Sequence, residues 1–79
     1  MQLTDPILVG LIANRLCEVR EDHGHTKEYV LHATGLNISD YERKVKSPTT
    51  SSLAKFCALY HMTLAEFFAP IDYPPKNSF

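Results

Sequence analysis

The chain has 79 residues, of which 44% are apolar and 3 are glycine, and its formal net charge is −1. This length predicts one domain with a single core, and the ordinary apolar share argues against a disordered chain. The near-neutral charge disfavours nonspecific nucleic-acid binding, and no apolar run reaches the roughly 18 residues of a membrane span, so we expect a cytoplasmic protein without membrane contact.

The first part of the chain predicts a long helix from Asp5 to Gly24. Asp5 can accept hydrogen bonds from the first free backbone donors, and Pro6 is tolerated in a first helical turn. Apolar residues then recur at spacings of four and three, as a buried helical stripe requires: Leu8, Ile12, Leu16 and Val19. Gly24 is a typical residue at the end of such a helix.

Two short helices are expected next. Thr26 is a hydroxyl cap for a second helix of about two turns, which stops at Gly35. Asn37 is the expected cap of a third helix, whose apolar residues Ile38, Tyr41 and Val45 follow a helical spacing.

The last part predicts two more helices and a tail. The stretch "SPTTSS" supplies a turn and several caps before the apolar face that begins at Leu53. Thr63 and Glu66 have capping-box spacing at the start of a fifth helix. The proline-rich segment 71–79 cannot continue that helix and should run extended. We therefore predict an all-α chain with one domain over residues 1–70.

Charge is distributed unevenly along this chain. Between residues 41 and 55 the only acid is Glu42, whereas the cations are Arg43, Lys44, Lys46 and Lys55. The sequence thus predicts a basic edge on an acidic body. Such an edge is either a phosphate-contacting surface or an ordinary solvated face.

Sites for catalysis or metal binding are not indicated. Cys17 and Cys57 both lie inside apolar helical patterns and are expected to be reduced thiols. His23 and His25 flank a helix-ending glycine, without a carboxylate or thiol at ligand spacing. The serines are explained by turns and caps. We expect no enzyme activity, no cofactor, no metal and no small-molecule effector.

Residues 11–68 resemble the helix-turn-helix domain of phage-repressor-like regulators, the lambda-repressor or XRE family. The matching stretches are "RLCEVREDHGHTKEYV", "TGL", "ISDYERK" and "SPTTSSLAKFCALYHMTLAEFF". The resemblance implies a five-helix lambda-repressor-like DNA-binding domain. Its second helix would cross the DNA backbone and its third would enter the major groove.

Carried over residue by residue, the resemblance implies a set of DNA contacts. Thr26 and Lys27 would meet phosphate at the start of the second helix. The residues on or near the third helix that are free to face double-stranded DNA are Asn37, Ser39, Asp40, Arg43, Lys44 and Lys46. Of these, Asp40 could accept from cytosine N4 or simply repel phosphate.

The family pattern also implies an ion pair between Arg20 and Glu42, which would tie the first helix to the third. Two features depart from the pattern. Gly35 and Glu42 are about three positions closer than is usual, and Leu31 stands where the family favours alanine. Both departures predict an altered angle between the second and third helices.

A single small domain gains sequence discrimination by pairing, so we expect a homodimer. Aromatic residues late in the chain are the expected dimer or tail contacts: Tyr60, Phe68, Tyr73 and Phe79. The leading hypothesis is a small transcriptional regulator, a repressor that binds a palindromic operator. The alternative is a helical protein-interaction module of the same fold that has lost operator recognition.

Overall fold

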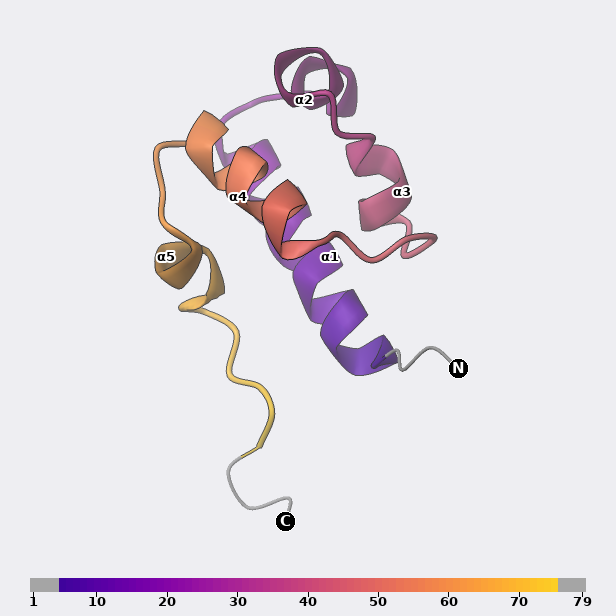
Figure 1. Cartoon of the computed structure of the whole chain (residues 1–79), viewed down its shortest axis with the longest axis vertical. Coiled ribbons are helices and arrows are strands. Elements are labelled where there is room, and N and C mark those ends of the chain that lie inside the picture. Colours follow the sequence, from indigo (N-terminus) through magenta and orange to yellow (C-terminus); the bar gives the residue numbers. More distant parts are fainter. Residues whose placement is uncertain (1–4, 76–79) are drawn as a thin grey trace.

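The computed structural model describes residues 5–75 of the chain. This range contains five helices joined by short turns (Figure 1). They are α1 (Pro6–Asp22), α2 (Lys27–Thr34), α3 (Ile38–Glu42), α4 (Thr50–Leu59) and α5 (Leu64–Phe68). Within this range there is no strand, so the predicted all-α class is confirmed. None of these helices combines the length and apolarity that a membrane crossing demands.

Side-chain caps explain where the helices begin. Asp5 Oδ1 accepts from the backbone N–H groups of Ile7 (3.0 Å) and Leu8 (3.2 Å) at the start of α1. At the start of α5, Thr63 accepts from the Glu66 N–H at 3.0 Å, and the Glu66 carboxylate accepts from the Thr63 N–H at 2.8 Å. This reciprocal pair is the predicted capping box.

The core forms where the apolar faces of the helices meet. Its largest fully buried side chains are Phe56, Phe67, Leu16, Ile38 and Val30. Figure 1 shows α1 as the long central helix, with α2 beyond its C-terminal end, α3 along one side of it and α5 on the opposite side. α3 packs on α1, α2 contacts both α3 and α4, and α5 contacts α4.

The third helix is shorter than its apolar spacing predicts. α3 ends at Glu42, and Val45 is 59% exposed, so Val45 is not part of the buried face. The reason is a backbone reversal at Lys44, whose φ is 64°. The Val45 N–H donates to the Asp40 carbonyl at 2.9 Å and the Lys44 N–H to the Tyr41 carbonyl at 3.1 Å. These two bonds form a Schellman closure with lysine at the position that glycine usually occupies.

One further expectation needs correction, and it concerns the turn between α2 and α3. The Asn37 side chain makes no capping hydrogen bond, although Asn37 occupies the N-cap position of α3. Leu31 is 40% exposed, so much of its side chain lies outside the packing between the helices. The turn after α2 depends on Gly35, which has a φ of 79° and donates its N–H to the Leu31 carbonyl at 2.8 Å.

The aromatic residues expected at a dimer contact are used within the chain itself. Tyr60 is only 8% exposed and belongs to the core, which corrects its assignment to a partner surface. Phe68 is half-buried, with its ring edge-on to Phe67 at 5.1 Å. The Tyr73 hydroxyl donates to Asp5 Oδ2 at 2.5 Å, so the tail returns to the start of α1. Phe79 lies outside the described residues.

Candidate nucleic-acid interface

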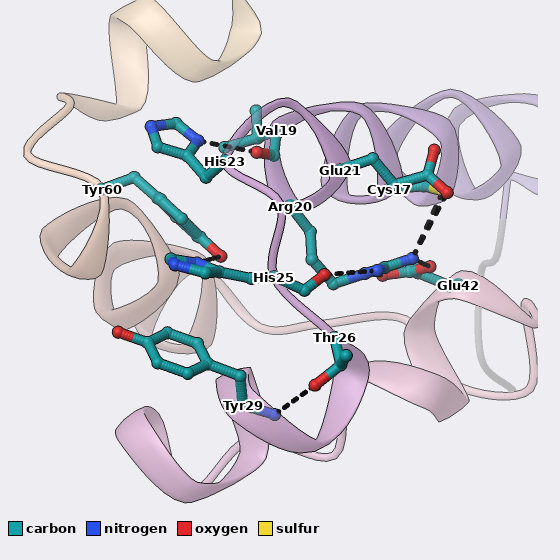
Figure 2. Close-up of polar contacts among 10 residues, drawn as sticks. All are labelled: Cys17, Val19, Arg20, Glu21, His23, His25, Thr26, Tyr29, Glu42 and Tyr60. Atoms are coloured by element: carbon teal, nitrogen blue, oxygen red, sulfur yellow. Dashed lines mark hydrogen bonds and ion pairs between the residues drawn. The ribbon is translucent and has the colours of Figure 1, made fainter.

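Arg20 is the residue that joins α1 to the α2–α3 segment. Its Nε donates to Glu42 Oε2 at 2.8 Å and its Nη2 to Glu42 Oε1 at 3.0 Å, so the pair is bidentate (Figure 2). Its Nη1 donates to the His25 carbonyl at 2.8 Å. The Arg20 and Glu42 side chains are 10% and 5% exposed. The ion pair expected from the sequence is therefore present and largely buried. One guanidinium holds both the entry to α2 and the last residue of α3.

The electrostatics of this junction follow from the same contacts. The hydrogen bonds with Glu42 raise the pKa of Arg20 above its ordinary value, in spite of burial, which acts in the opposite direction. Cys17 lies beside the pair, with its Sγ 3.6 Å from Arg20 Nη2. Burial raises the pKa of the Cys17 thiol, and the carboxylates of Glu21 and Glu42 raise it further. Cys17 is therefore a neutral thiol at physiological pH.

An aromatic cluster fixes the turn between α1 and α2. The His25 ring stacks on the Tyr29 ring at 3.9 Å, and its Nδ1 is hydrogen-bonded to the Tyr60 hydroxyl at 2.9 Å. The His23 ring lies 4.5 Å from the Tyr60 ring, and its Nδ1–H donates to the Val19 carbonyl at 2.8 Å. Figure 2 shows that these rings approach one another from the α1–α2 turn, α2 and α4. The start of α2 is thus held to α4 as well as to α1.

The outward face of α3 carries polar side chains. Ile38 is buried and Glu42 is paired, so the opposite face of this helix presents Ser39 and Asp40, which are half-buried. Arg43 lies one helical turn after Ser39 and is exposed. The structure therefore brings these three expected DNA-contacting residues onto one surface.

Three neighbouring residues extend or border this surface. Asn37 is exposed, and its Nδ2 donates to Asp40 Oδ2 at 3.4 Å. Lys46 Nζ lies 3.9 Å from the same carboxylate. The Lys44 side chain takes another direction, against α1, where its Cε would be 3.8 Å from a methyl group placed on Gly10. Lys44 is thus separated from the outward face of α3.

The start of α2 is the second part of the expected interface. The Thr26 hydroxyl oxygen accepts from the Tyr29 N–H at 3.1 Å, so its main role in this structure is to cap the helix. Lys27 is exposed in the first helical turn. An exposed cation beside free N–H groups and the positive end of a helix dipole favours an anion.

Comparison with known proteins adds no relative. No family model matches the chain, and no curated protein or solved structure matches it. The assignment of a function therefore depends on the geometry described above.

The sequence did not indicate two of the residues that hold the helices together. The sequence offers His25 only as a possible metal ligand, yet it connects the start of α2 to α4 through Tyr60, which is 35 positions further along the chain. Arg15 reaches the end of α5, where its Nε donates to the Phe67 carbonyl at 2.6 Å. Neither contact belongs to a local pattern, so only the packed structure reveals it.

Proposed function

We propose that this protein is a sequence-specific DNA-binding transcriptional regulator with a lambda-repressor-like fold. The observation that carries the proposal is the division of α3 into two faces. Ile38 and Glu42 hold the inward face to the core and to Arg20. Ser39 and Arg43 on the outward face have no hydrogen-bonding role between side chains in the described structure and are free to meet base edges.

The chemistry of the outward face suits the major groove. Arginine can donate two hydrogen bonds to guanine, while asparagine can pair with adenine and serine with several bases. Arg43, Asn37 and Ser39 supply these groups around α3. Lys27 and Lys46 are exposed cations that would contact phosphates on either side and set the register of the domain.

The length of α3 argues for a dimer. Its 5 residues correspond to a rise of about 7.5 Å. That rise covers about two base pairs. One domain would therefore read a very short half-site. A homodimer on a palindromic operator, with half-sites about 34 Å apart, would double the reading surface. Occupation of such an operator in the cytoplasm represses transcription by excluding polymerase.

A second function is favoured by a different observation. α2 exposes two large apolar side chains, Tyr29 at 46% and Leu31 at 40%. Tyrosine is among the residues that are enriched where proteins bind one another. The second candidate is thus an interaction module that binds a protein through α2 and does not read DNA.

Charge-matched variants separate these two functions. Arg43→Ala removes a cation from the outward face of α3, whereas Lys55→Ala removes one from α4. Binding to a selected operator should fall at least tenfold in Arg43→Ala, since a bidentate base contact contributes about 1 to 3 kcal/mol. Lys55→Ala should bind nearly as well as the original chain. Equal binding by both variants would show that Arg43 does not read the operator. No DNA binding by a folded protein would favour the interaction module.

Salt dependence gives an independent check on the same proposal. Contacts to phosphate from Lys27 and Lys46 would give each protomer a slope of about −1.8 in the logarithm of affinity against the logarithm of salt concentration. Fluorescence anisotropy on a labelled duplex measures this slope. Lys27→Ala should reduce its magnitude by about 0.9 while leaving the preferred sequence unchanged.

A further inference from the structure

Asp40 is the one acidic side chain on the outward face of α3, and it is surrounded by groups expected to bind DNA. Its carboxylate accepts from Asn37 Nδ2 at 3.4 Å and lies 3.9 Å from Lys46 Nζ. Its backbone carbonyl accepts from the N–H groups of Val45 (2.9 Å) and Lys46 (3.2 Å). Asp40 thus contacts both the amide that precedes α3 and the cation that follows it.

We propose that Asp40 determines specificity by holding Lys46 and Asn37 away from DNA until a correct site provides a donor for its carboxylate. This inference rests on the proposed function and assigns a regulating role within the same interface. A negative charge on a phosphate-binding surface lowers its affinity for every duplex. It favours only a site that places a hydrogen-bond donor, such as the amino group of cytosine, opposite it.

The strengths of the contacts fit this role. The Asp40 and Lys46 side chains are 23% and 69% exposed, and an ion pair at such exposure is weak. Lys46 can therefore leave Asp40 for a phosphate without a large penalty. At an incorrect site, however, that movement leaves the carboxylate facing DNA with no cation beside it. At a correct site, the cytosine amino group takes the place of Lys46, and Asn37 is released toward the neighbouring base.

The direct test compares Asp40→Asn with Asp72→Asn, which removes the same charge from an exposed position in the tail. Binding of each protein to its selected operator and to a random duplex is measured by anisotropy over a range of salt concentrations. For Asp40→Asn we expect a steeper salt slope on the random duplex, by about 0.9, because Lys46 gains there the phosphate contact that it already makes at the operator. Affinity for random duplex should rise at least fivefold, and the ratio of operator to random affinity should fall about tenfold. Asp72→Asn should leave the salt slope nearly unchanged, and it should change neither the affinity for random duplex nor the affinity ratio by more than about twofold.

Two more variants distinguish this role from a structural one. Asp40→Glu keeps the charge and should restore most of the affinity ratio. In a Lys46→Gln background, Asp40→Asn should no longer steepen the salt slope, because the cation that it would release is absent. Circular dichroism checks that each variant retains its helices.

The possible failures are distinguishable. If the unmodified chain binds no duplex, the proposed function is wrong and this inference falls with it. If the unmodified chain binds an operator but Asp40→Asn behaves like Asp72→Asn, only the inference is overturned. The inference is also overturned if a folded Asp40→Asn loses affinity equally for all sequences.

Discussion

Arg20 and Glu42 are 22 positions apart in the sequence and form a bidentate ion pair whose hydrogen bonds measure 2.8 and 3.0 Å. Because α3 has only 5 residues, it has little surface of its own with which to pack. Its orientation therefore depends on this pair and on the buried Ile38. The arrangement of the candidate interface follows directly from these two attachments.

Removal of one member of this pair should destabilise the fold strongly. Glu42→Ala leaves the buried Arg20 charge with only the exposed Glu21 carboxylate nearby, at 3.9 Å. We expect a loss of about 3 to 5 kcal/mol in the free energy of unfolding. Glu21 is the matched control, because its carboxylate is 65% exposed and 3.9 Å from Arg20. Glu21→Ala should cost at most about 1 kcal/mol. Urea denaturation measures both values, and similar small losses would show that the pair does not hold α3.

The reversal at Lys44 predicts a stabilising substitution. Lys44 has a φ of 64°, a conformation that is unfavourable for a residue with a Cβ atom. Lys44→Gly relieves this strain, whereas Lys44→Ala keeps the strain and removes the same charge. We expect the glycine variant to be more stable than the alanine variant by about 1 kcal/mol. Thermal unfolding of the two variants side by side tests this, and equal midpoints would argue against a reversed backbone here.

Tyr60 predicts a loss of stability at alkaline pH. Burial, the largest cause, raises the pKa of the Tyr60 phenol above its ordinary value. The unfolded chain therefore releases this proton first as the pH rises. The contribution to stability is fully present below about pH 10 and is lost as the pH rises through the folded pKa. Urea unfolding at pH 8 and at higher pH should show a smaller alkaline loss in Tyr60→Phe than in the original chain. An identical loss in both would contradict the buried position of the phenol.

The contact between the tail and α1 can be tested at a single carboxylate. The hydrogen bond from the Tyr73 hydroxyl is the main reason why the pKa of Asp5 is lowered, and the hydrogen bond from the Leu8 N–H lowers this pKa further. Stability from these bonds is present above the ordinary pKa of an aspartate, about 4, and is lost as the pH falls through the folded value. Tyr73→Phe should move the Asp5 pKa upward in an NMR titration. An unchanged Asp5 pKa would mean that the tail does not return to α1.

The helix starts were predictable from sequence because caps act locally. Asp5, Thr26 and Thr63 each accept a hydrogen bond within three residues, which is a pattern that a sequence displays directly. The end of α3 was not predictable in the same way. Lys44 adopts a conformation usually reserved for glycine, so the apolar spacing alone extended the helix to Val45.

The sequence named most residues of the candidate interface, but it did not predict the directions of their side chains. The Arg20–Glu42 pair followed from a resemblance and is present in the structure. The directions of the Lys44 and Leu31 side chains depend on how the short helices pack in the folded domain. The local spacing of residues does not specify this packing. The contact between His25 and Tyr60 joins residues far apart in the chain, so it required the folded structure.

The most direct test of DNA reading is selection of bound duplexes from a random pool at about 0.1 M salt, a concentration at which phosphate contacts alone bind weakly. We predict enrichment of a palindromic motif with short half-sites spaced by about one helical turn. The same selection with Arg43→Ala should lose that motif while the variant stays folded. If the folded chain enriches no sequence, the proposal that the outward face of α3 reads DNA is contradicted.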